Sequence, residues 1–211
     1  MTNYDRGLRK YQACKYKETI LDYDQAVALS PACTEAYIKR GLAKLGLEDL
    51  KGALTDFDTV IFLDPTAAMG YFHRGQARVE LADFREAILD YDKAMIMNPE
   101  ITDAYLQRGV SKLMNDDYHG AIEDFDQAIL IRPGFAEAYS HKGEAKSWLK
   151  DLKGAMAEYN KAVEADPRYA IGYYNRGLLH LELGHMDSAL DDLHKAGELG
   201  KYEAYEILAR I

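Results

Sequence analysis

Apolar and small residues recur along the chain three and four residues apart, the spacing that lines one face of an α-helix. Between residues 50 and 63 these positions are Ala53, Leu54, Phe57, Val60 and Ile61. The pattern predicts an amphipathic helix over 50–63, preceded by another over 35–47. Aspartates before the second helices are well suited to cap their N-termini; they are Asp49, Asp83, Asp117 and Asp151.

This pair of helices recurs every 34 residues. Glycine occupies one position of the period, at Gly7, Gly41, Gly75, Gly109, Gly143 and Gly177, and proline another, at Pro31, Pro65, Pro99, Pro133 and Pro167. A proline disfavours helical geometry in the residue before it, so each proline is expected to end a second helix. One helix pair cannot bury its own apolar face, and the pairs are therefore expected to stack and share a core.

The period-locked residues resemble the tetratricopeptide repeat (TPR) family, whose 34-residue pattern is W-x2-L-G-x2-Y, then A-x3-F, then P. The resemblance covers essentially the whole chain in a Y-x-x-R-G form, with Tyr for Trp and a cation before the glycine. It implies an all-α, right-handed TPR solenoid forming a single array over 1–211. The six repeats are expected at 1–33, 34–67, 68–101, 102–135, 136–169 and 170–200, followed by a capping helix over 202–211.

Two complete sets of opposite charge follow the same period. The cations before the glycines are Arg6, Arg40, Arg74, Arg108, Lys142 and Arg176, and the second helices carry Asp22, Asp56, Asp90, Asp124, Glu158 and Asp192. The only Lys shares its repeat with the only Glu, whose extra methylene offsets the loss of the guanidinium fork. We predict a structural ion-pair ladder that joins the two helices of each repeat. Pairing between neighbouring repeats is the alternative.

Composition narrows the function further. The net charge of −9 argues against a nucleic-acid partner, because phosphate binding needs a concentrated basic surface. No apolar run is long enough to span a membrane, and no signal peptide is recognisable. Cys14 and Cys33 indicate no disulfide framework, which favours a reducing compartment. We expect a cytoplasmic protein, with an exported form whose signal was removed as the open alternative.

No catalytic or metal motif stands out. His180, His185 and His194 lack the i, i+4 spacing of a zinc-binding helix, and phosphate-loop, dinucleotide and nucleophile-elbow motifs are absent. Most carboxylates serve every repeat alike, whereas an active site is normally a single place. We therefore expect a chain that is not an enzyme, with no cofactor, no metal and no catalytic residue.

The family resemblance places partner binding on the first helices, which line a concave groove. The residues this implies are Ile38, Lys39, Leu42, Phe72, His73, Leu106, Gln107, Val110, His141, Tyr174, Asn175 and Leu178. Apolar members would anchor a segment, and polar ones would select it. Trp148 has two interpretations, a groove-edge anchor or local packing against the turn at 150–152.

Two better-defined uses of TPR grooves do not fit these residues. The carboxylate clamp for chaperone C-terminal tails requires a set of Lys, Asn and Arg on three consecutive first helices, and no three repeats supply it. An asparagine ladder for peptide backbones would find only Asn175 in the relevant row. The expected partner is a protein or peptide with apolar anchors. A self-assembling array, weakly associating through its first repeat, is one alternative; the docking part of a larger enzyme or of a secretion or assembly factor is another.

Overall fold

The computed structural model of the chain describes residues 16–211. Its helices are α2 (Tyr16–Leu29), α3 (Thr34–Leu45), α4 (Leu50–Leu63), α5 (Ala68–Glu80), α6 (Phe84–Met97), α7 (Thr102–Met114), α8 (Tyr118–Ile131), α9 (Ala136–Trp148), α10 (Leu152–Ala165), α11 (Ala170–Glu182), α12 (Met186–Glu198) and α13 (Glu203–Leu208). No strand occurs within this range, so the predicted all-α class is confirmed. The helices predicted over 35–47 and 50–63 are α3 and α4, within two residues at each end.

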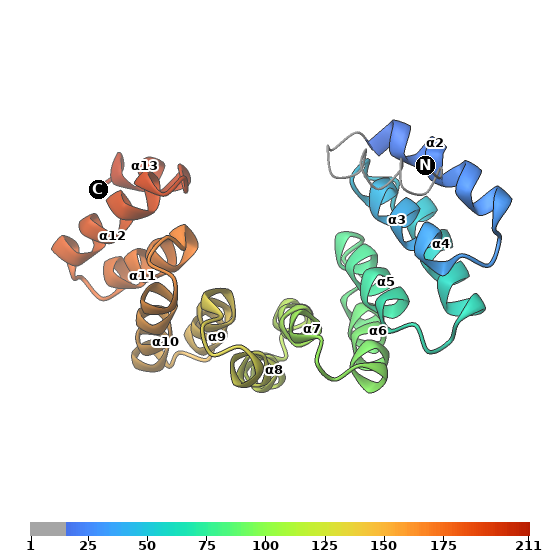
Figure 1. Ribbon diagram of the computed structural model, residues 1–211. Helices are drawn as coiled ribbons and strands as arrows, with labels where there is room; N and C mark the ends of the chain where they lie inside the picture. The colour runs from blue at the N-terminus through green and yellow to red at the C-terminus, as the bar shows by residue number, and fades with distance from the viewer. Residues whose placement is uncertain (1–15) are drawn as a thin grey trace. The chain divides into compact units, whose positions relative to one another are not determined.

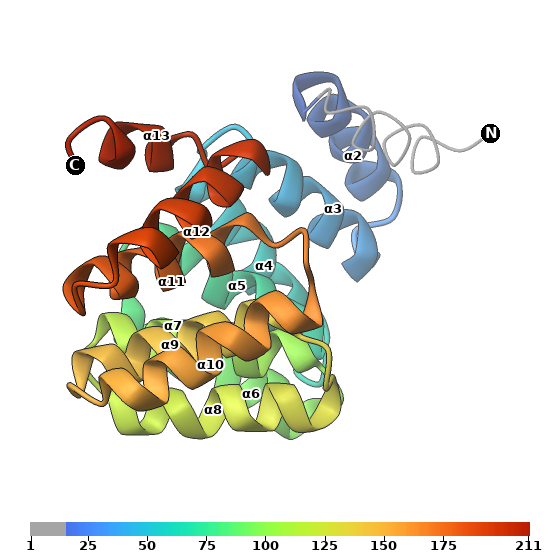
Figure 2. The same ribbon diagram turned by 90° about the vertical axis from the view of Figure 1, so that its left-hand side faces the viewer.

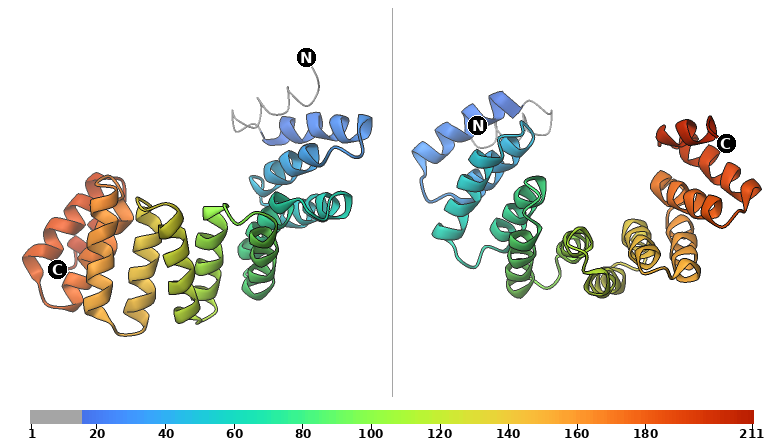
Figure 3. Two further views of the ribbon diagram at one scale, coloured as in Figure 1. Left: turned by 60° about the horizontal axis from the view of Figure 1, so that its bottom comes forward. Right: turned by 180° about the vertical axis from the view of Figure 1, so that it is seen from behind.

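The chain forms two compact units that divide inside α7, between Ser111 and Lys112. In the first unit, α3 packs on α4 and α5 packs on α6, while α2 packs on α3 and α4 on α5. In the second unit, each helix from α8 to α13 packs on the next one. The contacts of α9 with α10 and of α11 with α12 lie within a helix pair, and those of α8 with α9 and of α10 with α11 join neighbouring pairs. Helices that follow one another therefore lie side by side within each unit (Figures 1 and 2). Figure 3 shows the same stacking of α9 to α12 from two further sides.

The period-locked glycines allow an aromatic ring of the second helix to pack directly against the backbone of the first helix. A Cβ atom on Gly41 would lie 2.6 Å from Phe57 Cε1, and one on Gly75 would lie 2.8 Å from Tyr91 Cε1. Any side chain at these positions would push the second helix away. In these pairs the glycine of the first helix and the aromatic residue of the second form one close contact. In the last pair Leu193 takes the place of the aromatic residue, and a Cβ atom on Gly177 would lie 3.0 Å from its Cγ.

The turn between the helices of a pair contains one residue with a left-handed backbone. These residues are Glu48, Ala82, Asp116, Lys150 and Gly184, with φ of 61°, 59°, 63°, 62° and 76°. They are spaced by 34 residues, and only the last one is glycine. The turn is therefore imposed by the helices on both sides, at a cost of about 1 kcal/mol at each non-glycine residue.

Three of the four predicted aspartate caps form. The side chains of Asp49, Asp117 and Asp151 accept hydrogen bonds from the backbone N–H three residues later, at 3.0, 3.0 and 2.9 Å. Asp83 occupies the same position at the start of α6 but makes no side-chain cap hydrogen bond. The donor residue is glycine in the three caps that form, and a Cβ atom on Gly52 would lie 2.1 Å from Asp49 Oδ2. Glu86 stands at that position in α6, and its Cβ atom disfavours this cap.

The last helix packs against α12. Ala204 of α13 is fully buried in a cluster with Leu193 and Ala196. A Cβ atom on Gly197 would lie 2.5 Å from the ring of Tyr205, so the glycine makes room for this tyrosine. The short α13 thus covers apolar surface that a further repeat would otherwise contact.

Candidate functional site

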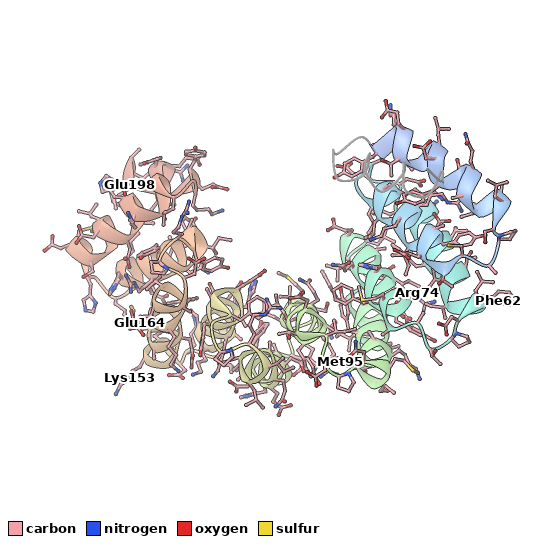
Figure 4. The ribbon with its side chains drawn as sticks, viewed as in Figure 1. Phe62, Arg74, Met95, Lys153, Glu164 and Glu198 are labelled. Carbon is pink, nitrogen blue, oxygen red and sulfur yellow. The ribbon has the colours of Figure 1, made fainter. Side chains whose placement is uncertain are left out.

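Buried carboxylates on the second helices bind the cations on the first helices of the same pair. The shortest separations are 2.6 Å for Arg40 Nη2–Asp56 Oδ1, 2.6 Å for Arg74 Nη2–Asp90 Oδ1 and 2.7 Å for Arg176 Nη2–Asp192 Oδ1. Lys142 Nζ lies 3.2 Å from Glu158 Oε1. Figure 4 labels Arg74 among these side chains. Arg6, the expected partner of Asp22, lies outside the described residues, and Arg108 and Asp124 belong to different units.

The same cations also reach the preceding helix pair. Arg40 Nη1 lies 2.7 Å from Asp24 Oδ1, and Arg74 Nη1 lies 2.7 Å from Asp58 Oδ1. This second acceptor lies 16 residues before its cation; the acceptors are Asp24, Asp58, Asp92, Asp126 and Asn160. The predicted pairing within a repeat therefore forms, and a second contact joins neighbouring repeats through acceptors outside the predicted ladder. The sequence analysis did not identify these second acceptors. Four of them follow the 34-residue period and could have been found by it: Asp24, Asp58, Asp92 and Asp126.

A third group completes each cluster from the position that holds the second Tyr of the TPR pattern. Lys44 Nζ lies 2.8 Å from Asp56 Oδ2, Arg78 Nη1 lies 2.7 Å from Asp90 Oδ2, and the equivalents are Lys112, Lys146 and His180. Asp56 and Asp90 thus each hold two basic groups, and Glu158 also contacts a third, Lys161 Nζ at 3.2 Å. Burial opposes the charged form, but the hydrogen bonds and charges of Asp90 and Asp58 raise the pKa of Arg74.

The tyrosine of Y-x-x-R-G supports the arginine three residues later. The guanidinium carbon of Arg40 lies 5.3 Å from the ring centroid of Tyr37, and that of Arg74 lies 5.6 Å from the ring of Tyr71. These distances fall within the range of a cation–π contact. In the described copies that have these contacts, the motif therefore serves packing inside and between repeats, and carboxylates hold its arginines.

Two of the expected groove anchors are buried. Phe72 is only 6% exposed, and its ring packs 5.8 Å from that of Tyr91 in a cluster with Ala87 and Ala104. Leu106, at the equivalent position of α7, is 2% exposed. The assignment of Phe72 and Leu106 as partner anchors is therefore wrong, because these two side chains are turned into the core. Ile38 and Tyr174, in the same row, are half-buried.

The remaining groove residues stay half-exposed. They are Lys39, Leu42, His73, Gln107, Val110, His141, Asn175 and Leu178. Two histidines bridge neighbouring positions: His73 Nδ1 lies 2.7 Å from Gln76 Oε1, and His141 Nδ1 lies 3.1 Å from Glu144 Oε2. Burial lowers the pKa of His73, a shift that the hydrogen bond to Gln76 opposes in part.

Trp148 projects at the end of α9 and remains 59% exposed. Its ring lies parallel to that of Tyr118, with centroids 6.1 Å apart and planes 7° apart. Neither contact considered from the sequence included Tyr118, which stands 30 residues earlier at the start of α8. The stacking holds the indole plane in place while much of its surface stays accessible.

Two cavities open beside these residues. One, of about 670 Å³, is lined in part by Leu42, Gly46, Gln76 and Glu80, between α3 and α5. The other, of about 260 Å³, is lined by Glu144, Ser147, Trp148, Tyr159, Asn175, Leu178, Leu179 and Glu182. The second cavity therefore brings together three residues expected from the sequence, Trp148, Asn175 and Leu178.

Within residues 16–211, no group of three or more His, Cys, Asp and Glu side chains is arranged to hold a metal ion. Over the same residues, none of the helices has the length and apolar character needed to cross a membrane.

Comparisons with known proteins point to one family. Family profiles described as "TPR repeat" and "Tetratricopeptide repeat" match residues 149–184 and 72–140. Solved structures with the same fold include MamA, which is 25% identical with a TM-score of 0.71 and matches over 78% of this chain and 96% of its own. A tetratricopeptide repeat protein from Parabacteroides merdae is 22% identical, with a TM-score of 0.77 over 98% of this chain and 82% of its own.

A third structure with this fold is YrrB, described as a TPR protein with an unusual peptide-binding site. It is 21% identical, with a TM-score of 0.66 over 90% of this chain and 98% of its own. A comparison with curated proteins finds no match.

Proposed function

The chain belongs to the tetratricopeptide repeat family, and on that premise we propose that it is a non-enzymatic interaction module that binds a peptide or protein segment along the exposed side of its first helices. TPR proteins in general act as protein-interaction scaffolds. The described peptide site of YrrB is a property of that protein, and its likeness to this chain concerns the fold alone.

The observation that carries the proposal is the position of the two cavities. Leu42, Gly46, Gln76 and Glu80 line the first, and Glu144, Trp148, Leu178 and Glu182 line the second. Each residue of the first set stands 102 positions, or three repeats, before its counterpart in the second. One place in the repeat thus forms an opening in both units, while the packing positions around it stay filled.

A neighbouring row of the first helices, whose member Asn175 lines the second cavity, differs between repeats. The row of Lys39, His73, Gln107, His141 and Asn175 changes in charge and hydrogen-bonding capacity from one first helix to the next. The ion-pair positions, by contrast, hardly change. A constant scaffold with a variable exposed row is suited to reading one extended partner. Because Phe72 and Leu106 are buried, they are not among the proposed anchors. The proposed anchors are Ile38, Leu42, Val110, Trp148, Tyr174 and Leu178.

A peptide selection tests this proposal. A library of random dodecapeptides displayed on phage is selected on the immobilised chain, and the enriched peptides are synthesised. Their affinities are then measured for the wild type, for Leu178→Ser and for Phe62→Ser. Phe62 is 83% exposed on α4, away from both cavities, so Phe62→Ser is the matched control for loss of an exposed apolar side chain.

We expect enriched peptides whose dissociation constant rises at least tenfold in Leu178→Ser and stays within twofold in Phe62→Ser. Far-UV circular dichroism and urea unfolding establish that both variants are folded. Peptides that bind Leu178→Ser as well as wild type would place the binding surface elsewhere. A selection that enriches no peptide at all counts against the function itself.

A further inference from the structure

The cavity between α9 and α11 carries negative charge that no cation of the described chain neutralises. Glu144 and Glu182 both line it, and neither has a Lys or Arg within ion-pair distance among residues 16–211. The only ionic contact of Glu144 is with His141 Nδ1, at 3.1 Å. By contrast, the buried carboxylates Asp56, Asp90 and Glu158 are each matched by at least two basic groups. Glu144 is half-exposed and Glu182 is exposed, so both carboxylates are accessible to a ligand at this opening.

A hydroxyl group without a partner lies in the same cavity. Tyr159 is 5% exposed and lines the opening, yet its hydroxyl makes no hydrogen bond to any described residue. Burial, and then the charges of Glu144 and Glu182, raise the pKa of this hydroxyl. It is therefore a neutral group in a negative field. Because Tyr159 lines the opening, a donor on a ligand can reach its hydroxyl oxygen.

The wall of the cavity is aromatic and apolar. Trp148 is held parallel to Tyr118 and keeps most of its surface accessible, and Leu178 lies beside it in the lining. A guanidinium group stacks on an indole face, donates to carboxylates in a fixed fork, and brings an apolar stem suited to a leucine. An ammonium group satisfies the charge but lacks the planar shape.

We infer that this cavity receives an arginine side chain of the partner segment, paired with Glu144 and Glu182 and stacked on Trp148. The inference rests on the proposed function, since it names one contact that the bound segment makes. Charge complementarity supports the choice of occupant: the chain is acidic overall, and this opening has two carboxylates with no cation opposite them.

Comparison with the first cavity shows which lining residues occur in the second cavity alone. Glu80 is the counterpart of Glu182, and Glu48 also lines that opening. The counterpart of Trp148 is Gly46, which makes room for the ring of Tyr16: a Cβ atom there would lie 2.5 Å from Tyr16 Cζ. The first cavity is acidic but has no tryptophan, so the indole and carboxylates occur together only in the second of these two cavities.

Matched variants separate charge at the cavity from charge in general. Glu144→Gln with Glu182→Gln removes both carboxylates and keeps the side-chain shape. Glu164→Gln with Glu198→Gln changes the net charge equally at exposed positions that line no described cavity (Figure 4). The wild type and both double variants are used in parallel for the dodecapeptide selection. An enriched peptide is then synthesised with each arginine replaced in turn by citrulline, which is isosteric and uncharged.

The single tryptophan of the chain, Trp148, serves as the fluorescence reporter of binding. We expect the wild type and the exposed-site control to enrich peptides with an arginine at one fixed position. Replacing that arginine by citrulline should weaken binding to both proteins at least tenfold. The same replacement should change the affinity of the Glu144→Gln/Glu182→Gln variant less than twofold.

The remaining outcomes contradict the inference in different ways. Enriched peptides that lack arginine but lose affinity for Leu178→Ser overturn the arginine site and leave the proposed function standing. An equal effect of citrulline on the wild type and on the Glu144→Gln/Glu182→Gln variant shows that the arginine binds elsewhere. A selection that enriches nothing on any of the proteins overturns both the inference and the proposed function.

Discussion

Replacing Asp90 by asparagine should destabilise the first unit strongly, because this side chain is the buried centre of an ion cluster. Its oxygens accept from Arg74 Nη2 at 2.6 Å, from Arg74 Nε at 3.0 Å and from Arg78 Nη1 at 2.7 Å. The Asp90 side chain is 3% exposed, and those of Arg74 and Arg78 are 18% and 22% exposed. Asparagine keeps the shape but leaves two guanidinium groups without their shared anion.

Removing one member of a buried pair costs about 3–5 kcal/mol. The arginines retain some contact with water, and Arg74 keeps its bond to Asp58, so the lower end, about 3 kcal/mol, applies here. This corresponds to more than a hundredfold change in the local folding equilibrium, since about 1.4 kcal/mol is tenfold. Asp58→Asn, whose side chain is 60% exposed, is the matched control and should cost at most about 1 kcal/mol.

Urea unfolding followed by circular dichroism gives the free energy of unfolding of each variant. Hydrogen exchange of the amides in α5 and α6 then shows whether the loss is local, as expected in a repeat array. Replacing all three members by apolar residues, with Asp90→Leu, Arg74→Met and Arg78→Met, should cost less than Asp90→Asn alone. A cost below about 1 kcal/mol for Asp90→Asn would show that the cluster acts like an ordinary surface bridge and refute the reasoning.

Three further predictions concern packing, the turn and acid stability. Phe72→Ala should lower the free energy of unfolding by about 3–5 kcal/mol in urea, because the ring is buried against Tyr91. Ala82→Gly should raise the free energy of unfolding by about 0.5–1 kcal/mol, and with it the melting temperature, since φ is 59° there. Gly184→Ala should lower the free energy of unfolding by a similar amount, since φ is 76° there. Burial opposes the charged form of Glu158, but the hydrogen bond from Lys146 and the charge of Lys142 lower its pKa below 4.5. The stability that this carboxylate contributes is therefore present above pH 4.5 and lost as the pH falls through the lowered pKa, so wild type and Glu158→Gln should converge in melting temperature upon acidification.

The fold could be predicted from the sequence because its determinants are periodic. The close contact of Gly41 with Phe57 depends on residue types at fixed positions within 16 residues, and such contacts repeat with the motif. The pairing of Arg40 with Asp56 follows from the same local geometry. The link from Arg40 to Asp24 was missed although Asp24 follows the period, because it depends on how one helix pair is rotated against the next.

That rotation also explains the error at Phe72. Helical spacing tells which residues share a row, but it does not tell whether a row at the edge of the apolar face is covered by the next pair. In the structure Phe72 is covered and joins the core, whereas Ile38 and Tyr174 of the same row stay half-buried. The cavity around Trp148 could not be predicted for a similar reason, since it is formed by residues of α9, α10 and α11. The sequence marked Trp148, Asn175 and Leu178 as candidates for partner binding, but it did not show that they line one cavity.

The central claim is that the exposed side of the first helices binds a peptide segment at the cavity containing Leu178 and Trp148. The most direct test is a titration of the Trp148 fluorescence with one library-selected dodecapeptide, in the wild type and in Leu178→Ser. The account predicts a saturable change in the wild type and a dissociation constant at least tenfold higher in Leu178→Ser. Equal dissociation constants in the two proteins, with the peptide lost instead from Phe62→Ser, would contradict it.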